Sequence, residues 1–182
     1  MSDNSASKYS LILTIHPNLL FPHVKYLIPA PAEFVIERSV PLFEARKRAI
    51  DRATQRLSLV LDADTIIPSE FLTSAMKKLQ QGYAACTLRY ANNIQDHPPF
   101  GASLWLTDTL KSLYDYDGYV REYKPVYQRT EDERGNDYYN ITNPFLCECL
   151  YMYAKLQKHE LYVFDDLLAE HIKRLRKSYL YS

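Results

Sequence analysis

The sequence predicts an α/β fold in which a mixed, mostly parallel central sheet is flanked by helices. Short apolar runs of strand length alternate with segments whose apolar residues recur every three or four positions, as on one face of a helix. The chain has 182 residues, of which 47% are hydrophobic, so it can build one core of ordinary size. We therefore expect a tail at 1–8 and a single domain at 9–182.

The first half predicts strand, strand, strand, helix, strand, helix and strand. The apolar run 57–61 ends abruptly at two acids, which is typical of a central strand that delivers side chains to its carboxyl edge. Pro68 and Ser69 are good starting residues for a helix, and Gly82 is a good terminator. The expected strands are 9–15, 24–28, 34–36, 57–61 and 83–90, and the expected helices are 42–56 and the segment between Ser69 and Gly82.

The second half is less regular. A polar, tyrosine-rich stretch over 114–140 predicts a long loop. Asn143 and Pro144 suit the cap and the first turn of a helix. The expected elements are a short helix, or a strand plus a helix, at 103–113, a helix at 145–158, a strand at 161–164 and a basic helix from 165 to about 179.

Charge and glycine content argue against several classes of protein. The 22 Lys and Arg residues balance the 22 Asp and Glu residues, so a broadly basic nucleic-acid binder is not expected. The four glycines lie at least 17 residues apart, which excludes a P-loop and a dinucleotide-binding glycine motif. If the protein handles a nucleotide, another group must hold its phosphates.

Cysteine content and apolar runs favour a cytoplasmic protein. The three cysteines form neither a disulfide framework nor a Cys-x-x-Cys pair. The first ten residues are polar and do not resemble a secretion leader, and no apolar run approaches the ~20 residues of a membrane helix. We expect no integral membrane segment, and these features are compatible with a homo-oligomer.

The most specific signal is the pair Asp62 and Asp64, which directly follows the apolar run 57–61. Two carboxylates one residue apart offer oxygen ligands to a hard divalent cation such as Mg²⁺ or Mn²⁺. A cation held there can bridge a diphosphate and so replace the missing glycine loop. The alternative interpretation is that these acids only cap the following turn.

The residues around this pair resemble the donor-binding half of GT-A fold glycosyltransferases, the nucleotide-diphospho-sugar transferase superfamily that includes glycosyltransferase family 2. That superfamily typically has an Ala-Arg-Asn-x-Gly-like helix, a hydrophobic strand ending in Asp-x-Asp, and a Pro-x-x-(Phe/Leu)-Leu helix. This chain has Lys47 and Arg48 where Asn is usual, and Ala49 where Gly is usual. The matching segments are 45–53, 62–68 and 71–72. The similarity covers about 9–115 and is specific mainly between 45 and 72.

The resemblance implies roles for individual residues. Asp64 would be the principal metal ligand, and Asp62 would contact the ribose or the metal. His171 is similar to the residue that often completes metal coordination near the end of this fold. The cofactor would be manganese or magnesium, and the donor would be a UDP- or GDP-sugar. By the resemblance, Arg46 would lie near the donor. Arg48 and Arg52 gather with it on the helix before the acidic pair, so all three are cations expected near the donor phosphates.

The same resemblance divides the chain into a donor half at about 9–99 and an acceptor half at about 100–182. Residues 100–106 are similar to the small-residue strand on the acceptor side of the family. An inverting enzyme also needs a carboxylate base that takes the proton of the acceptor hydroxyl. The candidates are Asp132, in the run Thr130-Glu131-Asp132, and Asp137, with Glu148, Asp115 and Asp117 as rivals.

Three hypotheses follow. The first is a metal-dependent glycosyltransferase that moves a sugar from a nucleoside diphosphate sugar to a hydroxyl of a glycan, protein or small molecule. The second is a phosphatase of the haloacid-dehalogenase type, in which Asp62 and Asp64 would be nucleophile and acid while Asp165 and Asp166 bind Mg²⁺. The third is a non-catalytic module that binds nucleotide sugars on the same fold.

Overall fold

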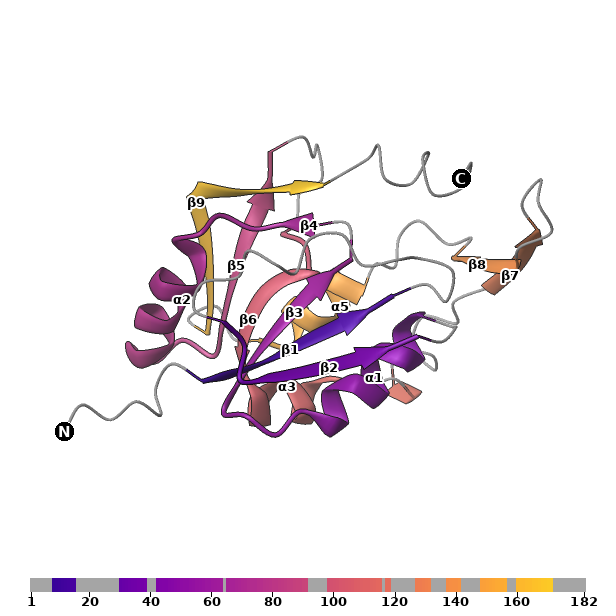
Figure 1. Cartoon of the computed structure of the whole chain (residues 1–182), viewed down its shortest axis with the longest axis horizontal. Helices are drawn as coiled ribbons and strands as arrows, with labels where there is room; N and C mark the ends of the chain where they lie inside the picture. The colour runs from indigo at the N-terminus through magenta and orange to yellow at the C-terminus, as the bar shows by residue number, and fades with distance from the viewer. Residues whose placement is uncertain are drawn as a thin grey trace.

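A mixed seven-stranded sheet runs through the centre of the computed structural model (Figure 1). In the order in which they pair, its strands are β2 (Glu33–Glu37), β1 (Tyr9–Thr14), β3 (Leu57–Asp62), β6 (Ala102–Leu106), β5 (Ala85–Tyr90), β9 (Leu161–His171) and β4 (Thr65–Ile66). The pairs β1–β2, β1–β3 and β5–β9 are parallel. β6 runs antiparallel to β3 and β5, and β4 runs antiparallel to β9.

The structure describes part of the chain. The described residues are 8–15, 30–38, 42–63, 65–91, 98–115, 117–118, 127–131, 137–141, 148–156 and 160–171. Within them, only the backbone is described at 42, 127–131, 137–141, 148–150 and 171.

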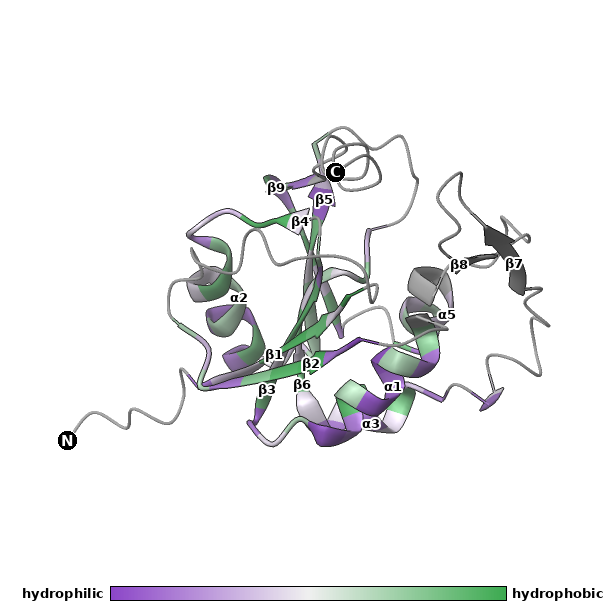
Figure 2. Cartoon of the chain, turned by 45° about the vertical axis from the view of Figure 1, so that its right-hand side comes forward, coloured by the Kyte–Doolittle hydropathy of each residue, from purple (hydrophilic) through white to green (hydrophobic). Residues whose placement is uncertain are grey.

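Helices cover both faces of the sheet. α2 (Phe71–Gln80) packs on one face, whereas α1 (Leu42–Arg52), α3 (Thr107–Leu113) and α5 (Glu148–Ala154) pack on the other. Figure 2 shows the hydrophobic strands enclosed between these two helical layers. None of the helices in the described ranges is long and apolar enough to cross a membrane.

The central strand β3 contributes to the cores on both faces. Leu59 and Leu61 belong to the cluster beneath α2, whereas Val60 belongs to the cluster beneath α1, α3 and α5. Ser58 points toward a polar partner instead, since its hydroxyl lies 2.8 Å from that of Thr107. A strand buried on both faces reads as a continuous apolar run, which is why the sequence predicted it correctly.

α2 confirms the helix predicted between Pro68 and Gly82. Its apolar stripe is buried against the sheet, as its helical spacing predicted. Gly82 follows with a φ of +104°, a left-handed conformation that glycine adopts without a steric penalty. The buried residues of the stripe are Phe71, Leu72, Ala75, Met76 and Leu79.

Two predictions for the second half are wrong. Residues 165–171, expected to begin a basic helix, extend β9. Within them, 168 and 169 pair with β5 while 170 and 171 pair with β4, and this pairing outweighs their helical propensity. The expected loop 114–140 contains strand β7 (Tyr127–Glu131) and all but the last residue of β8 (Asp137–Ile141), and these two strands form a separate antiparallel hairpin. The predicted strand 24–28 and the rest of the predicted basic helix lie outside the described residues.

A bulge in β9 brings the end of this strand to the end of β3. Leu88 pairs with Phe164, but the next residue, Arg89, pairs with Leu168, so the residues between them leave the ladder. Figure 1 shows β9 turning and running on toward β4. Because β4 begins three Cα steps after Asp62, its start lies at most about 11 Å from the end of β3. In the order of pairing, however, β6, β5 and β9 lie between β3 and β4. The sheet therefore curls, so that its edge strand β4 comes close to the end of β3.

Glu33 connects β2 to β1 and to the segment before β3. Its carboxylate accepts hydrogen bonds from the Ser10 hydroxyl and from the N–H and hydroxyl of Thr54. Burial raises the pKa of Glu33, but hydrogen bonds from Ser10, Thr54 and Gln55 lower it by more, so the net pKa lies below its ordinary value.

We predict that Glu33 contributes to the loss of stability in acid. Because its folded pKa lies below its unfolded pKa, its contribution is complete above the unfolded pKa and is lost as pH falls through the folded pKa. Glu33→Gln should flatten the fall of the urea midpoint below about pH 5. Glu70→Gln, at an exposed position, is the control, and a slope in Glu33→Gln equal to that of the wild type would contradict this role.

Candidate functional site

The candidate site lies where β1 and β3 end. The two strands are parallel neighbours, and Thr14 at the end of β1 pairs in register with Asp62 at the end of β3. Polar side chains at the carboxyl ends of such strands commonly form the ligand sites of α/β proteins. The Asp62 side chain is 34% exposed, although the strand before it is buried. Asp62 is therefore positioned to meet a ligand.

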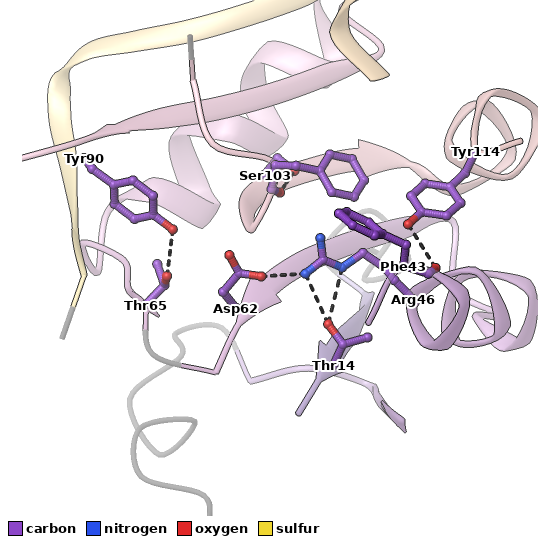
Figure 3. A network of polar contacts seen from close by, with 9 residues as sticks. Thr14, Phe43, Arg46, Asp62, Thr65, Tyr90, Ser103 and Tyr114 are labelled. Atoms are coloured by element: carbon purple, nitrogen blue, oxygen red, sulfur yellow. Dashed lines mark hydrogen bonds and ion pairs between the residues drawn. The ribbon is translucent and has the colours of Figure 1, made fainter. Parts of the chain in front are cut away.

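Arg46 reaches Asp62 from α1 (Figure 3). Its Nη2 lies 2.6 Å from Asp62 Oδ1, and its Nε and Nη2 also donate to Thr14 Oγ1 at 3.3 and 3.2 Å. The guanidinium lies over the ring of Phe100, with 5.4 Å between Cζ and the ring centroid. The Arg46 side chain is only 4% exposed, so these partners compensate for the cost of burying its charge.

The contact with Arg46 occupies one oxygen of Asp62. Among the described residues, no hydrogen bond is formed to the other oxygen, Oδ2. A carboxylate fixed through one oxygen can accept a hydrogen bond from a ligand hydroxyl with the other. Arg46 also balances the negative charge of Asp62, which weakens the attraction of this carboxylate for a metal cation.

A second polar contact holds β4 in place. The hydroxyls of Thr65, in β4, and Tyr90, at the end of β5, lie 2.8 Å apart (Figure 3). Since β9 lies between β5 and β4 in the sheet, this hydrogen bond reaches across β9. It ties the segment that follows the two acids to the body of the sheet.

His171 is brought to the same segment. It is the last residue of β9 and pairs in register with Thr65, the residue that follows Asp64 in the chain. Antiparallel partners have Cα atoms about 4.5–5.5 Å apart. The side chains of Asp64 and His171 lie outside the described part. Among the side chains that are described, no group of three His, Cys, Asp or Glu residues is arranged to hold a metal ion.

The other cations expected near the donor have different partners. Arg48 Nη1 lies 2.7 Å from Glu44 Oε1, and Arg52 Nη2 lies 2.7 Å from Glu37 Oε2. Of the three arginines, Arg46 is therefore the one that contacts Asp62.

The candidate bases are placed only in part. Asp132 lies outside the described residues, and Asp137 begins β8 of the separate hairpin, where only the backbone is described. Glu148 begins α5 and is also described by its backbone alone. Of the rivals, Asp115 and Asp117 are exposed. Asp115 Oδ1 accepts a hydrogen bond from the backbone N–H of Gly118 at 2.9 Å.

The contacts of Thr14, Thr65 and Tyr90 were not predicted from the sequence. Each depends on pairing between strands that are distant along the chain, and a local pattern does not contain that pairing. The one available signal was the position of Thr14, a hydroxyl residue at the end of the first apolar strand.

We predict that Arg46→Met lowers the free energy of unfolding by about 1–3 kcal/mol, because it leaves Asp62 without its cation while keeping much of the side-chain volume. Urea denaturation measures the change. The control is Arg48→Met, whose side chain is 41% exposed and which should cost less than about 1 kcal/mol. Equal losses in the two variants would contradict a special role for the pair formed by Arg46 and Asp62.

Residues 34–156 match the family model described as Glycosyl transferase family 2. The match covers about two thirds of the chain and includes Arg46, Asp62 and Asp64. No curated protein matches this sequence.

Three solved structures align with most of this chain. A197 from STIV superposes with a TM-score of 0.54 at 14% sequence identity, over 90% of this chain and 85% of that chain. A structure of S. aureus TarS 1-349 has a TM-score of 0.47 at 9% identity and covers 90% of this chain. A second one, in complex with UDP-GlcNAc, has the same score and identity and covers 92%. This chain spans 60% and 59% of those two TarS chains.

Proposed function

Because the chain belongs to glycosyltransferase family 2 and has the mixed α/β GT-A fold, we propose that it transfers a sugar from a nucleoside diphosphate sugar to a hydroxyl acceptor. The observation that carries this proposal is the Asp62–Arg46 pair at the end of β3, inside the segment that matches the family. The acceptor is a glycan, a protein or a small molecule, and the donor is a UDP- or GDP-sugar.

Asp62 is the proposed contact for the nucleoside part of the donor. Arg46 holds one of its oxygens at 2.6 Å, which leaves the other to accept a hydrogen bond from a ribose hydroxyl. Because the carboxylate is already fixed by a buried partner, little side-chain freedom is lost when the donor binds.

A divalent cation, Mn²⁺ or Mg²⁺, belongs to the proposal, with Asp64 and His171 as its ligands. The pairing of Thr65 with His171 supports this assignment, since it brings position 171 beside the residue after Asp64. Carboxylate and imidazole are suitable ligands for such a cation. When bound, it neutralises charge on the departing diphosphate, a task for which the scattered glycines provide no loop. Asp62 is the weaker metal ligand because Arg46 already balances its charge.

The acceptor hydroxyl loses its proton to a carboxylate base, for which Asp132 and Asp137 are the candidates. In the sequence, Asp132 lies between β7 and β8 and Asp137 begins β8. Both therefore follow the expected donor half at about 9–99. A base in this role must lie within hydrogen-bond reach of the acceptor hydroxyl when the sugar is bound.

The phosphatase hypothesis loses support from the structure and the family match. Its second acidic pair, Asp165 and Asp166, lies in the bulge of β9, where Asp165 Oδ1 accepts a hydrogen bond from Arg89 Nε at 3.0 Å. An assay of phosphate release from p-nitrophenyl phosphate with Mg²⁺ distinguishes the two activities, because a glycosyltransferase should be inactive in it.

We predict that Asp64→Ala lowers Mn²⁺-dependent release of nucleoside diphosphate from a panel of UDP- and GDP-sugars by about 100-fold or more. Asp51→Ala is the control, because Asp51 is exposed on α1 and pairs only with the nearby Lys47 among described residues. Unchanged turnover in Asp64→Ala would contradict the assignment of Asp64 as a metal ligand.

In the same assay, Asp132→Asn or Asp137→Asn should lower kcat with little change in KM. Binding without turnover in the wild type would favour a non-catalytic module.

A further inference from the structure

Gly101 lies directly against the carboxylate of Asp62. The carbonyl oxygen of Gly101 accepts a hydrogen bond from the N–H of Asp62 at 2.9 Å, just before β6 begins. A Cβ atom at position 101 would lie 2.0 Å from both Cγ and Oδ2 of Asp62 and 2.4 Å from Oδ1. Contacts of a Cβ below 3.0 Å essentially do not occur. The carboxylate therefore occupies the space that any side chain at position 101 would need.

The requirement for glycine at this position is steric and not conformational. Gly82 is the glycine with a left-handed φ among the described residues, and Gly101 is outside that region. Alanine at position 101 would therefore not incur the strain of a left-handed backbone. The obstacle to alanine is instead the steric clash between its Cβ atom and the Asp62 carboxylate.

The backbone at 99–101 cannot easily shift away from Asp62, because its neighbours are held by hydrogen bonds and ring packing. The carbonyl oxygen of Pro99 accepts hydrogen bonds from the Thr87 hydroxyl at 2.9 Å and from the Tyr153 hydroxyl at 2.8 Å. Between Pro99 and Gly101, the ring of Phe100 is buried and stacks on Tyr114, with 5.8 Å between the ring centroids. Interiors packed in this way resist displacement.

Asp62 could clear the space only by turning its carboxylate. That rotation would break the 2.6 Å contact between the Asp62 carboxylate and the buried Arg46 guanidinium. Losing one partner of a buried ion pair is costly, because the other charge stays in a poorly solvated place. A side chain at position 101 therefore acts on the Asp62–Arg46 pair.

We propose that Gly101 is a positioning residue of the donor site: its missing side chain is what lets the Asp62 carboxylate lie against Arg46 with its other oxygen available to the nucleotide. The claim that an Asp62 oxygen is available to the nucleotide rests on the proposed function. The claim that Asp62 excludes a side chain at position 101 does not, and it can be tested without a ligand.

The test introduces Gly101→Ala into the wild type, into Asp62→Asn and into Asp62→Ala. Asparagine keeps the shape of aspartate, so the clash remains, whereas alanine removes the crowded atoms. Gly101→Ala should lower Tm by about 4 °C or more in the first two backgrounds and by less than about 2 °C in Asp62→Ala. If the single variant does not fold, folding of Asp62→Ala/Gly101→Ala alone among the double variants supports the proposal. Equal effects in all three backgrounds would overturn it.

Calorimetry with UDP and GDP in the presence of Mn²⁺ tests the effect on the donor. Gly101→Ala should weaken binding of the preferred nucleotide by about tenfold or more. The matched control is Gly118→Ala, whose Cβ would lie 2.1 Å from Oδ2 of Asp115 and which should bind as the wild type does. Wild-type binding by Gly101→Ala would overturn the proposal. If the wild type binds neither nucleotide, the proposed function fails, and the thermal comparison still decides the steric role.

Discussion

The ion pair between Arg46 and Asp62 is the interaction on which the organisation of the site depends. A buried arginine needs an acceptor, and the strand end that supplies this acceptor is also the one that carries the acidic pair. Helix α1 is thereby linked to β3, and Thr14 adds β1 to the same contact. The zero net charge of the chain therefore conceals a local arrangement in which one carboxylate at the site is already balanced.

The curl of the sheet is the second constraint. Because only two residues separate β3 from β4, the edge strand that pairs with the end of β9 has to lie near the acids. The bulge between Phe164 and Leu168 lets β9 change direction, and the hydrogen bond between Thr65 and Tyr90 fixes the result. Position 171 thus lies beside β4, close to the end of β3, although it is near the end of the sequence.

Sequence patterns predicted the elements that are determined by their own residues. The apolar run before Asp62 and the stripe of α2 are local signals, and both were correct. The helix prediction for residues 165–171 was wrong because their composition favours a helix, whereas pairing of 168–171 with β5 and β4 holds the segment in a strand. The contact of Arg46 with Asp62 and the closeness of Gly101 to Asp62 were equally inaccessible, since both depend on how distant segments pack. The family resemblance assigned roles to the two acids, but it did not predict the contact between Asp62 and Arg46.

The most direct test of this account is a crystal structure of the chain with UDP or GDP and Mn²⁺, with anomalous scattering used to locate the metal. The account predicts that the nucleoside contacts Asp62 while Arg46 keeps its ion pair, and that the manganese peak lies beside Asp64 and His171. A nucleotide bound away from the end of β3, or a complex in which Asp62 has turned away from Arg46, would contradict it.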